Sequence, residues 1–369
     1  MNKYKIIIVC FCMLLAASAC KKDEVQFNIV PPFSGGLMTL QGIAGTELGQ
    51  NAANSVFVDF SKNNQVSITR KGWDLGLYTG ADYKVILNHS AGATAIQLNK
   101  NDLNQVTAAD STDAVVTSLN LGQSLTTVDA LTGNFPTYLN GTVIKDIAEN
   151  DADNKVFLIN SGVGGGLGGG LNLTNNRSWT KIRITRLKNG YTINYAGISD
   201  VGFRTITVIK DPAYNFKYMS FNSSFASGEP GKKDWDIEWG VSTYLNAAGL
   251  PVAEPDFVLI NFGAGVTAAQ IIFSGPNANS TIAYADFQVA NLTGITFSGN
   301  RDVIGKNWRN TDPAAVIAVY TDRYYLVQDP AGNIYKLRFN KFNASDGGSR
   351  GRPLIEFALV KAAPTPAGQ

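Results

Sequence analysis

The chain has 369 residues, which is enough for about two domains at roughly 150 residues each. With 44% hydrophobic and 16% charged residues the sequence excludes general disorder, and 31 Lys and Arg against 29 Asp and Glu leave no basic surface of the kind that binds nucleic acid. Its one histidine, His89, excludes any metal site built from several histidines.

The N-terminal segment has the pattern of an export signal. Two lysines precede an apolar run over residues 6–15, and small residues lead from that run to Cys20. The run is too short to span a bilayer, which takes about 20 apolar residues. The sequence therefore predicts a lipoprotein signal peptide over residues 1–19 and a tether over residues 20–36 that begins at a lipidated Cys20. A plain signal peptide with a chance cysteine is the alternative.

The rest of the chain carries one series of landmarks twice, which indicates a duplication. The first series consists of residues 56–61, Trp73-Asp74-Leu75, 85–98 and 179–186, and the second of residues 218–222, Trp235-Asp236-Ile237, 258–271 and 334–341. We therefore predict two tandem domains, over residues 37–210 and 211–362, and a flexible tail over residues 363–369.

Both copies are predicted to be built from strands. Residues 181–185 alternate polar and apolar side chains with a period of two, which is typical of a sheet with one solvated face. Asn189-Gly190 and residues 329–333 have the composition of hairpin turns. The sequence predicts an all-β fold of two sandwich-like antiparallel domains. Lys181 and Arg183, like Lys336 and Arg338 in the second copy, are predicted on the solvated face of their strand, and binding of ligand carboxylates is the alternative.

Two conspicuous patterns are interpreted as structural. The glycine-rich run over residues 161–170 contains a GxGxxG spacing, but no helix is predicted after it to hold a pyrophosphate, so we interpret it as a long hairpin loop. In each Trp-Asp pair, the tryptophan is expected to fill the core and the carboxylate to accept hydrogen bonds from backbone or indole N–H groups.

The sequence gives little support for catalysis, and we predict that the protein is not an enzyme. A Ser-His-Asp or Cys-His arrangement would need His89, and there is no GxSxG nucleophile elbow. His89 follows a predicted strand, and Phe262 takes its place in the second copy. Packing at a strand end and ligand binding are both open for His89, and a hydrolase is the third function class considered.

The ordered landmarks resemble a known family. Trp73-Asp74-Leu75-Gly76-Leu77, its counterpart Trp235-Asp236-Ile237 and the closing segment over residues 325–339 resemble the HmuY family of haem-binding lipoproteins of Bacteroidota. The resemblance implies an all-β fold, iron acquisition through capture of haem or a related porphyrin, and transfer to an outer-membrane haem transporter. Residues 21–24 resemble a lipoprotein sorting signal, which implies a lipid anchor in the outer membrane and exposure at the cell surface.

The ligands of the iron are where this chain departs from the family. The best-known members use two histidines, and this chain has one. Haem iron also accepts Met and Tyr, so the residues predicted to bind the cofactor are His89, Met219, Met38 and Tyr78, with His89 and Met219 on the iron. The alternative function is an adhesion, scaffold or glycan-binding lipoprotein that kept the fold and lost haem ligation.

Overall fold

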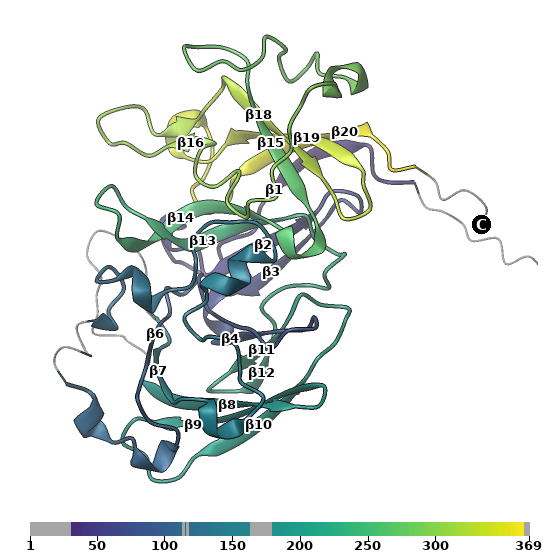
Figure 1. Ribbon diagram of the computed structural model, residues 1–369. Helices are drawn as coiled ribbons and strands as arrows, with labels where there is room; N and C mark the ends of the chain where they lie inside the picture. The colour runs from purple at the N-terminus through teal and green to yellow at the C-terminus, as the bar shows by residue number, and fades with distance from the viewer. Residues whose placement is uncertain (1–30, 113–114, 116–117, 163–178, 365–369) are drawn as a thin grey trace, which may run out of the picture. The chain divides into compact units, whose positions relative to one another are not determined.

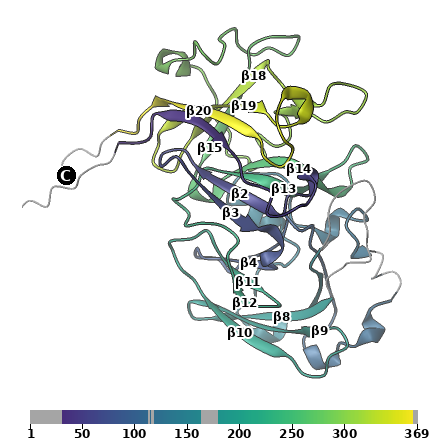
Figure 2. The same cartoon turned by 180° about the vertical axis from the view of Figure 1, so that it is seen from behind.

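In the computed structural model, described over residues 31–112, 115, 118–162 and 179–364, the chain is all-β, as predicted. Four antiparallel sheets, named A to D, stack as successive layers of the compact unit that begins at Pro32 (Figures 1 and 2). The predicted signal peptide, Cys20 and most of the glycine-rich run lie outside the described residues.

The outer layers, sheets A and D, have five strands each in an equivalent order. Sheet A consists of β1 (Gly35–Thr39), β20 (Leu354–Lys361), β19 (Ile334–Lys341), β18 (Arg323–Gln328) and β15 (Thr267–Ile272). Sheet D consists of β10 (Arg204–Ile209), β9 (Gly190–Gly197), β8 (Thr180–Leu187), β7 (Phe157–Asn160) and β6 (Thr94–Gln97). The two predicted hairpin turns are confirmed, because they join β8 to β9 and β18 to β19.

The inner layers, sheets B and C, have four strands each and also match in order. Sheet B consists of β14 (Pro251–Ile260), β13 (Ile237–Leu245), β2 (Asn54–Asp59) and β3 (Asn64–Thr69). Sheet C consists of β5 (Val85–Leu87), β4 (Leu75–Tyr78), β11 (Phe216–Ser220) and β12 (Ser224–Ala226). β16 (Arg309–Asn310) and β17 (Ala318–Val319) form a separate two-stranded sheet, and Val319 packs against the core between sheets A and B.

Two hydrophobic cores hold the layers together in pairs. Sheets A and B bury one apolar cluster between them, and sheets C and D bury a second one, because alternate side chains of each strand point to the same face. The A/B core includes Val56, Ile237, Tyr325, Leu337 and Ile355. The C/D core includes Leu75, Met219, Ile182, Ile193 and Ile206. We refer to the pairs as the A/B sandwich and the C/D sandwich.

Each sandwich takes strands from both sequence repeats. In sheet B, β2 of the first repeat pairs with β13 of the second, with Val58 opposite Ile237. In sheet C, β11 of the second repeat pairs with β4 of the first, with Met219 opposite Leu75. Strands β1–β3 of the first repeat therefore complete the A/B sandwich, and β11 and β12 of the second repeat complete the C/D sandwich. The division of the chain at residue 210 stays a prediction.

The carboxylates of the Trp-Asp pairs fasten these exchanged strands. Asp74 Oδ2 accepts a hydrogen bond from the N–H of Phe221, just after β11, at 2.8 Å. Asp236 Oδ2 accepts one from the N–H of Phe60, just after β2, at 2.7 Å. Both carboxylates are buried and bind backbone donors, as the sequence predicted. Each repeat therefore supplies the acceptor that closes the end of the other repeat's strand.

We expect Asp236→Ala to lower the free energy of unfolding by about 1–3 kcal/mol, because it leaves the buried Phe60 N–H without an acceptor. Burial raises the pKa of Asp236 well above its ordinary value, so Asp236→Asn, which keeps an oxygen in place without the charge, is expected to cost much less. Urea unfolding of both variants checks this expectation. Equal losses in the two variants would contradict the role of the hydrogen bond.

Short 3₁₀ helices connect the strands. They are η1 (Gly49–Asn51), η2 (Arg70–Gly72), η3 (Leu103–Gln105), η4 (Ala108–Asp110), η5 (Leu125–Thr127), η6 (Thr137–Gly141), η7 (Asp151–Asp153), η9 (Phe262–Ala264), η10 (Val289–Leu292) and η11 (Ala344–Asp346). Within the part of the chain that the structure describes, no helix has the length and apolar character needed to cross a membrane.

Candidate functional site

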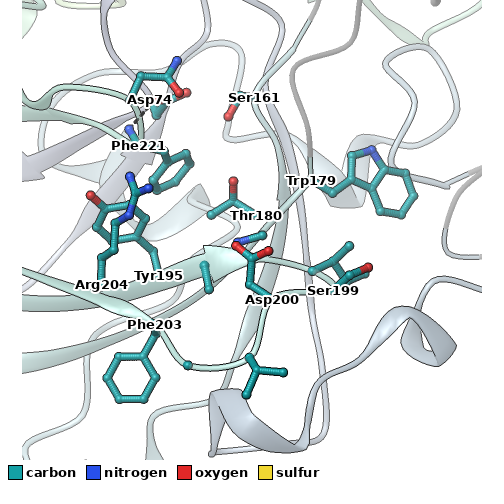
Figure 3. A pocket seen from close by; sticks show the side chains of 16 residues that line it. Asp74, Ser161, Trp179, Thr180, Tyr195, Ser199, Asp200, Phe203, Arg204 and Phe221 are labelled. Carbon is teal, nitrogen blue, oxygen red and sulfur yellow. Dashed lines mark hydrogen bonds between the residues drawn. The ribbon is translucent and has the colours of Figure 1, made fainter.

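A cleft of about 700 Å³ opens at one end of the C/D sandwich (Figure 3). Its walls come from the ends of β8 and β9, the start of β10, the loop between β9 and β10, and the residues next to β4 and β11. Ligand pockets for small molecules are typically about 300–1,000 Å³ in volume. The cleft therefore has room for a ligand of the size of a cofactor.

Aromatic rings form one wall of the cleft. Tyr195 on β9 lies against Phe221, with ring centroids 5.5 Å apart. The Tyr195 ring is buried, yet its hydroxyl makes no hydrogen bond to any other described residue. Phe203 lines the same cleft and leaves 45% of its surface exposed. The wall thus offers flat apolar surface together with one free phenol hydroxyl.

An unpaired cation stands at the rim. Arg204 begins β10 directly opposite Tyr195 and is exposed to solvent. Among the described residues, no carboxylate lies within 4.0 Å of its guanidinium. The nearby Asp200 is occupied otherwise, because its Oδ2 accepts the N–H of Gly197 at 2.9 Å. Arg204 is therefore available to a carboxylate of a ligand.

The A/B sandwich has no comparable cleft within the described residues, and the register shows why. Phe357 lies opposite Leu337 in sheet A just as Tyr195 lies opposite Ile182 in sheet D, so Phe357 corresponds to Tyr195. Phe60 corresponds to Phe221 by the same reasoning. Their rings are 4.9 Å apart, so the aromatic wall exists in both sandwiches.

Two larger side chains fill the equivalent space in the A/B sandwich. Tyr335 stands where the C/D sandwich has Thr180, and its ring lies 5.5 Å from Phe60. Phe33 precedes β1, lies 6.1 Å from Phe357, and accepts a hydrogen bond at its carbonyl from the Tyr335 hydroxyl at 3.1 Å. The space that is open beside Thr180 in the C/D sandwich is therefore occupied by side chains at the equivalent place in the A/B sandwich.

One prediction about the strands next to the cleft is wrong. Lys181 was expected on a solvated face, but it is 2% exposed. Its Nζ donates hydrogen bonds to the carbonyls of Val106 at 2.8 Å and Asp200 at 2.9 Å. A buried ammonium is stable here because backbone oxygens replace its water. The lysine thereby anchors the loop that forms one side of the cleft.

His89 lies elsewhere, in a cavity of about 40 Å³ between sheets B and C. Its Nδ1 is 3.2 Å from Ser242 Oγ, and its ring packs against Trp73 with centroids 6.0 Å apart. Burial, together with the charge of Arg301, lowers the pKa of His89 well below its ordinary value. The imidazole is therefore neutral at pH 7, and its 3.8 Å contact with Glu238 is not an ion pair.

The same cavity gathers buried carboxyl groups. Burial raises the pKa of Glu229 to about 8, although the N–H of Phe216 acts in the opposite direction. Burial also raises the pKa of Glu238 to about 6. Arg301, which is 5% exposed, lies over the ring of Tyr138 at 4.6 Å. The cavity is a polar contact between the two sandwiches, and its volume excludes a ligand of porphyrin size.

The remaining predicted ligands are spread over separate clusters. Met219 is 0% exposed in the C/D core, and Met38 is 8% exposed in the A/B core. Tyr78 packs against Phe135 and Phe216, on the face of sheet C that is turned away from the C/D core. None of these residues, nor His89, lines the large cleft. The structure does not bring the four together, and their role as ligands stays a prediction.

Comparison with protein families decides where the chain belongs. The model of the HmuY family, described as "HmuY protein", matches residues 51–357. The chain belongs to the HmuY family. Comparisons with curated proteins and with solved structures gave no match. The HmuY match runs through both sandwiches, and it agrees with the resemblance carried by the Trp-Asp landmarks and the closing hairpin.

HmuY-family membership makes haem the first ligand to compare with the cleft. Haem iron accepts His, Met, Cys or Tyr as an axial ligand. Along the described part of the cleft, Tyr195 is the one side chain of these types. The aromatic rings and the volume of the cleft, together with the unpaired Arg204, fit a flat macrocycle that carries carboxylates. The pair of histidines expected from the best-known members of the family is missing from this chain.

Sequence reasoning did not single out Tyr195, Arg204 and Thr180, which line the candidate cleft. The signal that could have found them is a difference between the repeats. Thr180 aligns with Tyr335, and a small residue in one copy where the other has a large ring indicates where space is left open.

Proposed function

We propose that this HmuY-family protein binds haem or a related porphyrin as cargo in the cleft of the C/D sandwich, without catalysing a reaction on it. The observation that supports this is the difference between the sandwiches. The same aromatic wall borders an open cleft beside Thr180 and a filled space beside Tyr335. A cavity that only one of two equivalent sandwiches keeps open is best explained by a ligand.

The residues of the cleft suit such a cargo. Phe203, which is 45% exposed, offers a surface for stacking a flat conjugated system, and the buried rings of Tyr195 and Phe221 form the apolar wall beside it. Arg204 is placed at the rim, where a carboxylate of the ligand remains partly solvated. The Tyr195 hydroxyl is the one described group of the cleft that haem iron accepts as an axial ligand.

The setting that we propose for this function is the outer face of the outer membrane. Lipidation at Cys20 would anchor the protein stably, since two or more acyl chains bind a bilayer far more strongly than one. The expected partner is an outer-membrane haem transporter that receives the cargo and so serves iron acquisition. These points rest on the N-terminal sequence pattern and on the HmuY family.

Filling the cleft tests the function. Thr180→Tyr introduces the side chain that the A/B sandwich holds at the equivalent position, so the fold should tolerate it. Haemin titration followed at the Soret band is expected to saturate near one equivalent with the unmodified protein, and to show at least about tenfold weaker binding with Thr180→Tyr. The matched control is Thr207→Tyr, on the exposed face of β10.

Three outcomes of the titration decide the matter. Absence of a saturable Soret change in the unmodified protein would end the porphyrin proposal. Equal binding by Thr180→Tyr and Thr207→Tyr would move the ligand out of this cleft. A changed Soret band in His89→Ala would return the iron to His89, whereas the position of His89 in the small central cavity leads us to expect an unchanged band.

A glycan is the second candidate ligand, because polar groups share the cleft with aromatic ones. Trp179, Asp200 and Asn222 all line it, and stacking rings beside hydrogen-bonding side chains also suit a sugar. Binding on a glycan array, lost in Thr180→Tyr and combined with no response to haemin, would favour this alternative.

A further inference from the structure

We infer that the cleft recognises the macrocycle and its carboxylates rather than the metal, so that metal-free and metal-loaded porphyrins bind about equally well. This inference rests on the proposed function and specifies its ligand class. The juxtaposition that carries it is the aromatic wall with the unpaired Arg204, in a cleft whose described walls hold neither histidine nor methionine.

Few side chains that could ligate iron are available to the cleft, because of both the sequence near it and the positions of His89 and the methionines. Residues 163–178, which follow the cleft residue Ser161 in the chain, contain no His, Met, Cys or Tyr. Met219 and Met38 are enclosed in the two cores, and His89 lies in the small cavity between sheets B and C. An iron atom in the cleft therefore has one candidate side chain, Tyr195.

Tyr195 itself is held by packing that does not involve a metal. Its ring fills the space between β9 and Phe221, and the corresponding Phe357 fills the same space in the A/B sandwich without any hydroxyl. The ring position is thus a property of the sandwich and is present where no cleft exists. The fold therefore fixes the place of Tyr195 whether or not a metal is bound, and the exposed ring of Phe203 provides area for stacking.

Without a metal ligand, the cleft can recognise a porphyrin through stacking area on its aromatic wall and through the charge of Arg204. Stacking on the aromatic wall depends on the conjugated ring system, which a metal-free porphyrin also has. Arg204 recognises a carboxylate, and the carboxylates of a porphyrin lie on its edge, away from the metal. Both contributions are therefore independent of the metal.

The experiment compares haemin, metal-free protoporphyrin and the dimethyl ester of that porphyrin, using quenching of tryptophan fluorescence in the full mature chain. We expect haemin and metal-free protoporphyrin to agree within about threefold in Kd, and the ester to bind about tenfold more weakly because it lacks the charges. Arg204→Gln should weaken the two acids by a similar factor and leave the ester unchanged. Arg352→Gln, an exposed arginine of the A/B sandwich, is the matched control.

Tyr195→Phe completes the test, because it removes the hydroxyl and keeps the ring. We expect it to leave both acids bound as before. Haemin binding that is more than about tenfold tighter than that of metal-free protoporphyrin would overturn the inference, and loss of that preference in Tyr195→Phe would assign the metal to the phenol. If neither acid binds, the proposed function fails, which is a different result from a preference for haemin.

Discussion

A fragment of residues 70–230 is expected to fold by itself, whereas a fragment of residues 37–210 is not. The first contains every strand of sheets C and D, including β11 and β12, and therefore the whole C/D core. The second follows the sequence repeat, but it separates β4 from β11 and leaves β1–β3 without their partners in the A/B sandwich.

The expected loss of stability explains why the fragment of residues 37–210 should not fold. The second fragment lacks Met219 and Phe221, which both belong to the C/D core. Removing a large core side chain costs about 2–5 kcal/mol, and a whole domain has a net stability of only about 5–15 kcal/mol. Near-ultraviolet circular dichroism and cooperative urea unfolding would distinguish the fragments. A cooperative transition in the fragment of residues 37–210 would contradict the exchange of strands between repeats.

Glu229→Gln is expected to stabilise the protein at neutral pH by roughly 3 kcal/mol and to have no effect near pH 4. Burial raises the pKa of Glu229 from 4.5 to about 8. Between these values the unfolded chain has lost the proton and the native protein has kept it. The native state then binds more protons, so the free energy of unfolding falls as pH rises and levels off above about pH 8. Glutamine removes this penalty and still accepts the N–H of Phe216.

Glu356→Gln is the control, and its expected effect on the free energy of unfolding has the opposite sign. Burial acts to raise the pKa of Glu356, but hydrogen bonds from Asn340 and Arg338 outweigh it and lower the pKa. Its ionised form therefore stabilises the fold above the ordinary pKa, and glutamine should cost up to about 1 kcal/mol at pH 7 for this partly exposed pair. Thermal unfolding between pH 4 and 9 checks both variants. A lower melting temperature for Glu229→Gln at pH 7 would show that the buried carboxyl is ionised and useful.

The fold class could be predicted from the sequence because it depends on local patterns. Alternation of side chains, the Asn189-Gly190 turn and the turn at residues 329–333 are each encoded within a few residues, and the structure has hairpins at both turns. The exchange of strands could not be predicted in this way. β2 and β11 both carry an alternating pattern that suits either Trp-Asp strand, so pairing within a repeat and between repeats look the same along the sequence.

The candidate site was harder to predict because it depends on space that a small side chain leaves unfilled. The sulfur atoms of Met219 and Met38 suggest iron ligation, but each residue stands at an inward position of an alternating strand, where a flexible apolar side chain packs the core. The cleft exists because the small side chain of Thr180 leaves space open, and the chemical type of a residue alone does not reveal such an open space. The repeat supplied an internal reference, since Tyr335 marks the filled version of the same place.

The stacking of the four sheets separates the N-terminal end of the compact unit from the cleft. β1 pairs with β20 at the edge of sheet A, so the first residues of the compact unit enter the outermost layer, and sheets C and D lie at the far end of the stack (Figure 2). The residues that line the cleft belong to or adjoin the strands of sheets C and D. Face-to-face sheets are spaced about 10 Å apart, which puts the cleft roughly 20–30 Å beyond the point of entry. If Cys20 is lipidated as proposed, sheets A and B would separate the cleft from the anchored end of the compact unit.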